Sequence, residues 1–223
     1  MIKAKDVSLI YSDGTIGLKE FNLNVDSGET LYITGPSGSG KTSLLKLLMG
    51  IESPTTGSLI VLDKSMNNAS EGDIRKLRRE IGIIFQEFKI IKGRTSYENV
   101  MMGLRFLDIP SKEMKERAID ILEQVGLGHK IHAKVENLSW GENQRVAIAR
   151  ALARKPKLIL ADEPTGNLDL DNAHNILNLL IGLKDEDTTV IITTHATHLI
   201  KDIEEGIFIS IRNGQIVVEK AGV

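Results

Sequence analysis

Short runs in which apolar and polar residues alternate open the chain, and this period of two predicts β-strands. Two such runs, residues 7–11 and 21–25, flank an Asp-Gly pair that favours a turn, so we expect neighbouring antiparallel strands. An apolar run at residues 30–34 then ends in a glycine-rich segment, and the leucine-rich residues 42–49 have helical spacing. The first quarter of the chain therefore predicts an antiparallel β portion, a further strand, a tight loop and a helix.

A strand, a helix and a strand follow one another in the last third. Residues 158–161 and 189–193 are apolar runs typical of buried strands, and residues 172–183 between them have helical spacing. Parallel strands need a long crossover of this kind, so the pattern indicates a mostly parallel sheet. Two apolar runs joined by an Asn-Gly turn, residues 207–211 and 215–218, predict a closing hairpin.

Helical spacing dominates the middle of the chain. We expect helices over residues 96–107, 111–125 and 139–154, with Pro110 and Pro156 near their ends. The fold class that this order predicts is α/β, with a mostly parallel sheet, flanking helices and an N-terminal antiparallel β portion, plus an inserted α-helical lobe. The single domain, residues 1–223, would consist of an α/β core in residues 1–87 and 151–223 and a helical lobe in residues 88–150.

Composition narrows the class of function. The 223 residues carry a net charge of −2, with 41% hydrophobic and 26% charged residues, as in ordinary globular domains. This balance argues against a broad basic surface, so no nucleic-acid partner is expected. The absence of cysteine excludes disulfides and thiolate chemistry and suits the cytosol. No apolar run approaches the ~20 residues of a bilayer span, so we expect any work at a membrane to require a partner.

One glycine-rich segment matches a phosphate-binding motif. Gly35-Pro36-Ser37-Gly38-Ser39-Gly40-Lys41-Thr42 fits GxxxxGK[ST] at every fixed position and lies between a predicted strand and a predicted helix. Lys41 would reach the β- and γ-phosphates of a nucleotide, and Thr42 would ligate Mg²⁺, which predicts a P-loop NTPase core. The nucleotide-binding candidates in and beside this loop are Gly35, Pro36, Ser37, Gly38, Ser39, Gly40, Lys41, Thr42 and Ser43.

Two carboxylates follow the buried strand at residues 158–161. Asp162 fits the Mg²⁺-linked position of a P-loop ATPase, and Glu163 is placed to polarise an attacking water as a general base. Two acids at a strand end are, by themselves, more often a solvated surface. Their pairing with the phosphate loop favours the catalytic interpretation, because ligands of open α/β folds bind at the carboxyl ends of the strands.

The sequence LSWGENQ, residues 138–144, introduces the last of the middle helices. Ser139 and Glu142 form a capping box, which alone explains why a helix begins here. A helix start with exposed N–H groups can also bind an anion. Since the phosphate loop already serves one nucleotide, such a second site makes sense where it meets the nucleotide of another subunit.

These motifs resemble the ABC ATPase family when they are taken together. The phosphate loop, the LSxGExQ segment, the strand ending in DEPTGNLD and a histidine after the next strand occur in the family's order over essentially the whole chain. The resemblance implies Mg²⁺-dependent hydrolysis of ATP to ADP and phosphate by a homodimer that sandwiches two ATP molecules. Ser139 and Gly141 would contact the γ-phosphate held by the partner subunit's Lys41, and Asp169 would lie in a loop across the dimer contact.

The same resemblance implies roles for three residues that would be unremarkable alone. Gln86 would sense Mg²⁺ and the attacking water, His195 would contact the γ-phosphate, and Tyr11 would stack on adenine. Their alternatives are a solvated residue after a strand, a structural histidine and a core aromatic. The catalytic candidates are therefore Glu163, His195, Gln86 and Lys41, and the metal-ligating candidates are Thr42, Gln86 and Asp162.

Trp140 departs from the family pattern. The family usually has two glycines after the signature serine, whereas this chain has Trp140 and Gly141. An indole keeps its backbone N–H, so the array of donors can survive. Its bulk would sit near the partner's nucleotide, and we hypothesise slower or partner-dependent hydrolysis, which leaves a clamp with little turnover as an alternative to a motor.

Residues 85–91 and 94–100 are similar to the bacterial cell-division ATP-binding proteins of the FtsE type, next to the lipoprotein-releasing and macrolide-efflux ATPases. This similarity implies a peripheral subunit on the cytoplasmic side of the inner membrane that drives a permease of the FtsX type, or a related one, in regulating cell-wall hydrolysis. A lipoprotein-releasing or macrolide-efflux motor and a soluble non-transport ABC ATPase are the alternatives. Phe88, Ile90 and Ile91 would line the groove for the permease, or would simply pack between the lobes.

Overall fold

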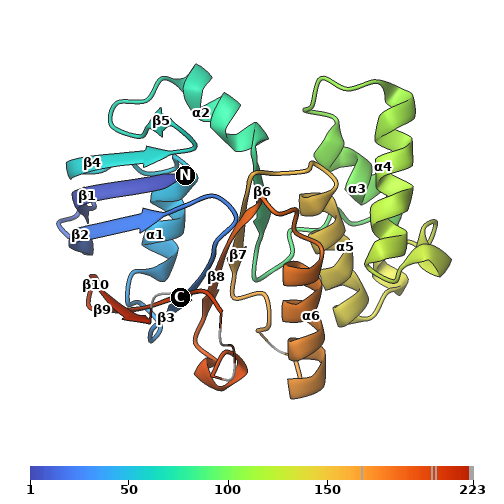
Figure 1. Cartoon of the computed structure of the whole chain (residues 1–223). Coiled ribbons are helices and arrows are strands. Elements are labelled where there is room, and N and C mark those ends of the chain that lie inside the picture. Colours follow the sequence, from blue (N-terminus) through green and yellow to red (C-terminus); the bar gives the residue numbers. More distant parts are fainter. Residues whose placement is uncertain (167, 202, 204, 221–223) are drawn as a thin grey trace.

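The strands form two sheets in the structure, a computed structural model that describes residues 1–166, 168–201, 203 and 205–220 (Figure 1). One sheet is antiparallel, in the order β2-β1-β4-β5, and the other has the order β10-β9-β3-β8-β7-β6. Five strands of the second sheet are parallel, and β10 pairs antiparallel with β9. The strands are β1 Ile2–Ile10, β2 Ile16–Val25, β3 Thr30–Thr34, β4 Thr56–Val61, β5 Lys64–Ser65, β6 Ile81–Ile84, β7 Leu158–Asp162, β8 Thr189–Thr194, β9 Ile207–Arg212 and β10 Gln215–Lys220.

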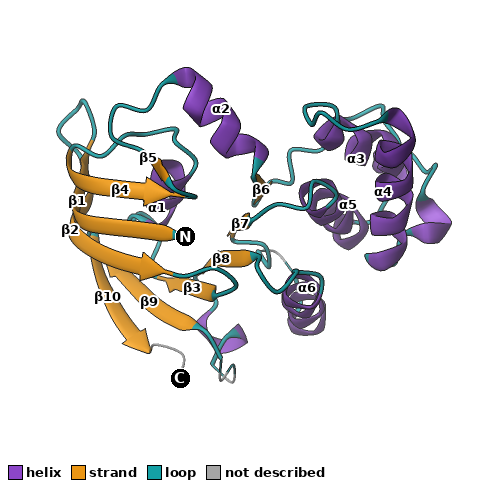
Figure 2. Ribbon diagram, turned by 45° about the horizontal axis from the view of Figure 1, so that its top comes forward, coloured by secondary structure: helices purple, strands orange, loops and turns teal. Residues whose placement is uncertain are grey.

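The helices divide between the two faces of the parallel sheet. Figure 2 shows α3, α4 and α5 grouped at one side of the molecule, away from the antiparallel sheet and α1. The α-helices are α1 Lys41–Leu48, α2 Glu71–Arg79, α3 Ser96–Leu104, α4 Ser111–Gln124, α5 Trp140–Leu152 and α6 Leu170–Gly182. Short 3₁₀ turns cover Gly128–Lys130, Val135–Asn137 and Thr197–Leu199. Within the described part of the chain, no helix combines the length and apolar character that a bilayer crossing requires.

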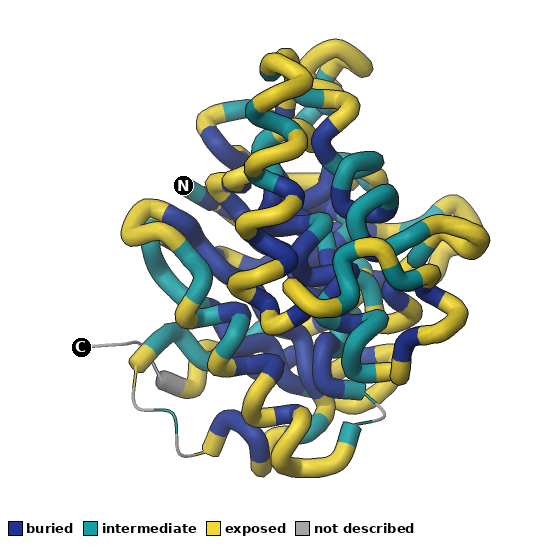
Figure 3. The backbone as a smooth tube through the Cα atoms, turned by 90° about the vertical axis from the view of Figure 1, so that its right-hand side faces the viewer, coloured by how far each residue is buried: buried dark blue, intermediate teal, exposed yellow. Residues whose placement is uncertain are grey.

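Two hydrophobic clusters meet at the parallel sheet, because its strands are buried on both faces. Along β7, Leu158 and Leu160 pack into the cluster that contains α1 and the antiparallel sheet, whereas Ile159 and Ala161 pack into the cluster that contains α3 to α6. The tube in Figure 3 is accordingly buried along its centre and exposed along its outer turns. The helices α1 and α5 therefore lie on opposite faces of the parallel sheet.

The predicted fold class is confirmed, and the differences are local. The helix expected over residues 96–107 ends at Leu104, with Arg105 as its C-cap, and a turn closed by the N–H of Leu107 and the carbonyl oxygen of Leu104 follows. The pattern did not locate β4, β5 or α2. The helical segment shares one hydrophobic cluster with the sheet, and the division at residues 88 and 150 stays a prediction.

Candidate nucleotide site

The phosphate loop between β3 and α1 depends on glycine at its tightest points. Gly35 and Gly40 have φ of 149° and 119°, in the region that favours glycine. A Cβ at Gly35 would lie 2.3 Å from the carbonyl oxygen of Ile211, and one at Gly40 would lie 2.6 Å from that of Gly17. The motif's glycines are therefore a packing requirement, because the loop passes directly against neighbouring backbone.

Lys41, the first residue of α1, folds its side chain back over this loop. Its Nζ donates to the carbonyl oxygens of Gly35 at 2.8 Å and Pro36 at 3.1 Å, and it lies 3.5 Å from Oε1 of Glu163. The lysine side chain is buried. A buried ammonium whose partners are two neutral carbonyls and one carboxylate is well placed to bind phosphate oxygens.

Hydrogen-bond donors without a side-chain partner lie near Lys41, and they indicate whether the loop can bind a phosphate. The N-cap of α1, Gly40, supplies no side-chain cap, so the first N–H groups of the helix have no partner of that kind. Oγ of Ser39 is buried and has no hydrogen-bond partner among the described residues. Phosphate oxygens would satisfy both sets of donors, so the loop fits the phosphates of a nucleotide.

Glu163 lies directly after β7 in a constrained conformation. Its φ is 45°, in the left-handed region, and its N–H is held by the carbonyl oxygen of Thr193 at 3.1 Å and Oγ1 of Thr193 at 3.0 Å. Oε2 of Glu163 lies 2.5 Å from Nδ1 of His195, which follows β8 and is 62% exposed at its side chain. The structure therefore brings Glu163, His195 and Lys41 together.

Asp162 ends β7 with its carboxylate fixed. Oγ1 of Thr193 donates to Oδ1 of Asp162 at 2.7 Å, which leaves Oδ2 available. Thr42, the second residue of α1, is exposed. Among the described residues, no group of three or more His, Cys, Asp or Glu side chains could hold a metal ion. A magnesium ion here would take few protein ligands and complete its shell from phosphate and water, as this ion commonly does.

Gln86 follows β6, after Phe85, and lies beside the turn that begins at Glu163. The N–H of Gly166 donates to the carbonyl oxygen of Glu163 at 3.1 Å and closes this turn. A Cβ at Gly166 would lie 3.5 Å from Nε2 of Gln86, an ordinary van der Waals contact, so the amide lies directly beside this turn. Gln86 thus adjoins the catalytic cluster from the neighbouring strand.

Tyr11 follows β1 and lies against α1. Its hydroxyl is 2.9 Å from Oγ of Ser43, and Nζ of Lys46 lies 5.4 Å from the centre of its ring. A Cβ at Gly17 would come within 2.9 Å of the ring, so Gly17 makes room for it. The tyrosine is half-buried, not a core residue, and it stands one helical turn from the phosphate loop.

Ser139 and Gly141 lie at the start of α5, across the sheet from α1. Oγ of Ser139 accepts from the N–H of Glu142 at 3.2 Å, and a carboxylate oxygen of Glu142 accepts from the N–H of Ser139 at 2.7 Å. This hydrogen bond from Ser139 lowers the pKa of Glu142 below its usual range. A Cβ at Gly141 would meet nothing within 4 Å, so the surface over it is open. The structure does not bring these two residues to the phosphate loop of their own chain.

Asp169 caps α6. Its Oδ1 accepts from the N–H of Asn172 at 3.0 Å and its Oδ2 from the side-chain amide of Asn172 at 2.7 Å. These hydrogen bonds lower the pKa of Asp169. The preceding Asn167 of the predicted loop lies outside the described residues. A helix cap therefore accounts for Asp169 within one chain, and its role at a dimer contact stays a prediction.

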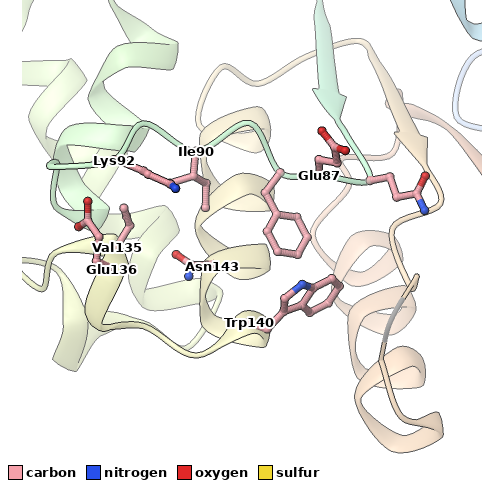
Figure 4. A pocket seen from close by; sticks show the side chains of 9 residues that line it. Glu87, Ile90, Lys92, Val135, Glu136, Trp140 and Asn143 are labelled. Atoms are coloured by element: carbon pink, nitrogen blue, oxygen red, sulfur yellow. The ribbon is translucent and has the colours of Figure 1, made fainter.

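Trp140 turns toward the segment after Gln86. Its indole meets the ring of Phe88 edge-on, with centroids 4.4 Å apart and planes at 62°. Both rings line a groove of about 610 Å³ between this segment and the head of α5 (Figure 4). The other lining residues are Gln86, Glu87, Ile90, Lys92, Val135, Glu136 and Asn143. Ile91, expected with Phe88 and Ile90, is not among them.

Two residues that position this site were not found from the sequence. Thr193 holds both Asp162 and the N–H of Glu163, and Gly17 makes room for Tyr11. The signal for Thr193 was present, since hydroxyl side chains end an otherwise apolar strand. Nothing in the sequence around Gly17 indicated its role, because a glycine within a strand does not reveal which side chain packs against it.

Comparisons with known proteins agree with this geometry. The family model described as ABC transporter matches residues 18–166. The phosphonates import ATP-binding protein PhnC of Lactobacillus gasseri is 39% identical, over 98% of this chain and 87% of the relative. The cell division ATP-binding protein FtsE of Streptococcus pneumoniae is 36% identical, over 99% and 96%. A solved dimer of an ATP-binding cassette in a post-hydrolysis state, bound to ADP and Pi, has a TM-score of 0.86 and 35% identity, over 99% and 98% of the two chains.

A phosphate loop, an acidic strand end and a histidine at the carboxyl edge of a parallel sheet define a P-loop nucleotide hydrolase. The chain belongs to the ABC transporter family, in which it is an ATP-binding and ATP-hydrolysing subunit.

Proposed function

We propose that two copies of this chain close around two ATP molecules and drive a membrane permease that acts in cell division. The observation that carries the proposal is the separation of Ser139 and Gly141 from Lys41. The first two lie at the open start of α5, and Lys41 lies on α1 across the parallel sheet. A phosphate bound at Lys41 therefore needs a second chain to receive donors from such a helix start.

Within one site, the described side chains support a division of labour. Lys41 holds the β- and γ-phosphates, while Thr42, Asp162 and Gln86 hold Mg²⁺ together with phosphate oxygens. Glu163 takes a proton from water as the water oxygen bonds to the γ-phosphorus and the bond to the ADP oxygen breaks. His195 stabilises the charge on the transferred phosphoryl group.

The adenine and the second subunit complete the arrangement. Tyr11 stacks on the base, since its hydroxyl is fixed by Ser43 and its ring is half-buried near the loop. Ser139 and Gly141 donate to the γ-phosphate at the partner's site, and Asp169 lies near the contact. The relative that forms a dimer with ADP and Pi supports this pairing.

The groove beside Trp140 receives a segment of the permease. It combines apolar walls from Phe88 and Ile90 with charged side chains of both signs, Glu87, Glu136 and Lys92, which suits an amphipathic helix with polar residues beside its apolar face. A chain that docks in this way works at the cytoplasmic face of the inner membrane, as a peripheral subunit.

The process served is cell division, through a permease of the FtsX type that regulates cell-wall hydrolysis. The similarity to FtsE spans nearly the full length of both chains and supports this role. The similarity to PhnC is as high, so import of an anionic small molecule such as a phosphonate is the second candidate.

One trapping experiment separates these roles. Glu163→Gln removes the base and keeps the phosphate loop, so the variant should bind Mg-ATP and accumulate as a closed dimer that retains its permease. We would purify it with Mg-ATP from detergent-solubilised membranes of the source cell and identify what co-purifies, with Lys41→Ala as the control that cannot hold the phosphates. A permease with cell-wall hydrolase factors supports the division role, an importer permease supports the second candidate, and recovery of no membrane protein contradicts both.

A further inference from the structure

The segment that links the parallel sheet to the helical part contains a strained turn. Phe88 and Lys89, two and three residues after Gln86, have φ of 49° and 48°. Non-glycine residues rarely occupy this left-handed region in succession, and such a pair persists only where surrounding contacts hold it. The contacts that hold this turn therefore decide where the segment lies.

Two side chains of α5 hold the turn. The guanidinium of Arg150 donates to the carbonyl oxygens of Phe88 at 2.5 Å and Lys89 at 2.7 Å, and burial lowers the pKa of Arg150. The indole of Trp140 packs edge-on against the Phe88 ring, which is 9% exposed. Arg150 fixes the backbone of the turn, and Trp140 fixes its side chain.

The contacts of Trp140 and Arg150 with the turn lie at opposite ends of α5. Trp140 is the first residue of α5 and follows Ser139, whose capping box with Glu142 ties the backbone of this first turn into one unit. A displacement of the Phe88 ring therefore reaches the N–H groups at the helix start through a single side chain. Arg150 lies near the other end of the helix, where no phosphate-binding residue is expected.

The groove makes this contact accessible to a ligand. Trp140 remains 38% exposed although it packs on Phe88, and it is one of the residues that line the groove (Figure 4). Oδ1 of Asn143, another lining residue, is buried without a hydrogen-bond partner among the described residues. An occupant of the groove would meet the indole, because Trp140 is one of the lining residues.

We propose that Trp140 is a positioning residue that joins the turn after Gln86 to the start of α5, so that Gln86 and Ser139 take up their places in the two nucleotide sites together. The inference rests on the proposed roles of Gln86 and Ser139 at the nucleotide. It assigns the indole to the groove rather than to an obstruction of the partner's nucleotide.

A double-mutant cycle tests the contact. Trp140→Ala and Phe88→Ala should each lower kcat of the purified chain by about three- to tenfold, the range that one aromatic pair supports, with the KM for ATP changed by less than about twofold. The double variant should be no slower than the slower single variant, because both changes remove one shared contact. Trp140→Phe should recover most of the rate. Phe106→Ala, which removes a 68% exposed ring outside the groove, is the matched control and should leave kcat unchanged.

The same variants give a spectroscopic readout, because Trp140 is the only tryptophan in the sequence. Phe88→Ala should shift its emission to longer wavelength and increase quenching by acrylamide. Mg-ATP should change the emission of Glu163→Gln, and adding Phe88→Ala should abolish that change. Circular dichroism of each variant is the control for folding. A variant with a lower rate and an unchanged spectrum has lost the contact and not its fold.

Three results would overturn the proposal. A faster Trp140→Ala with a neutral Phe88→Ala would show that the indole obstructs the nucleotide face. Unchanged kcat in both single variants would show that the Trp140–Phe88 contact serves packing alone. Rate losses that multiply in the double variant would show that the two residues have independent roles. None of these depends on which membrane protein co-purifies with Glu163→Gln, so failure here is distinct from failure of the cell-division role.

Discussion

Glu163 and His195 meet where two neighbouring parallel strands end, with Oε2 of the glutamate 2.5 Å from Nδ1 of the histidine. β7 and β8 are paired in register, from Leu158 opposite Thr189 to Asp162 opposite Thr193. Residues just past the two ends therefore lie side by side. The other carboxylate oxygen of Glu163 faces Lys41, so one side chain is held between the phosphate loop and the histidine.

His195→Ala should slow hydrolysis by about a hundredfold or more while ATP still binds. The histidine contacts Glu163, and in the proposed mechanism it stabilises the γ-phosphate, whereas ATP binding would depend on the phosphate loop. Phosphate release and binding of a fluorescent ATP analogue would measure the two effects separately. His198→Ala, which changes an exposed histidine three residues further on, should retain the wild-type rate. Equal rates for the two variants would remove His195 from the catalytic cluster.

Thr193→Val should lower kcat by about tenfold without unfolding the chain, because valine keeps the shape and loses a hydroxyl that bonds to Asp162 and to the N–H of Glu163. The rate in saturating Mg-ATP would measure this, along with the dependence of the rate on magnesium concentration. Thr188→Val is the matched control, since its buried hydroxyl donates to the carbonyl oxygen of Pro156, away from the site. A control that loses as much activity as Thr193→Val would point to general destabilisation.

The sequence predicted the parts of the site that obey local rules. The phosphate loop, the two acids at the end of β7 and the capping box at Ser139 each follow from spacing within a few residues, and each lies where the spacing implies. Asp169 shows the limit of such reasoning, because its local role as a helix cap explains it as well as any role at an interface.

Contacts between distant residues could not be predicted in this way. The sequence places Trp140 near a partner's nucleotide, because its neighbours belong to the signature segment, and that expectation stays a prediction. Its position against Phe88, 52 residues earlier, depends on how α5 packs on the segment after β6. Gly17 is likewise explained only once the ring of Tyr11 is seen beside it.

Gly35→Ala should destabilise the chain by about 2–4 kcal/mol, because the new methyl group would meet the carbonyl oxygen of Ile211, which belongs to a paired strand and cannot move away. Gly38→Ala is the control that measures the backbone strain of a positive φ without a steric clash. Gly38 has φ of 75° but open space around it, so its variant should lose only about 1 kcal/mol. Urea unfolding would measure both free energies. Similar losses at the two positions would contradict the close approach at Gly35.

Acidification should remove the stabilisation that Glu142 gives to the start of α5. Its folded-state pKa is lowered by the hydrogen bond from Ser139, so its contribution is complete above the unfolded pKa of about 4.3 and is lost as pH falls through the lower folded value. Glu142→Gln keeps an acceptor for the capping box and cannot ionise. The wild type should be the more stable protein at pH 7, and the difference should shrink as the pH is lowered from 5 toward 3. Urea unfolding of both proteins across that range would measure the difference, and one that stays constant would show that the charge of Glu142 contributes nothing to the cap.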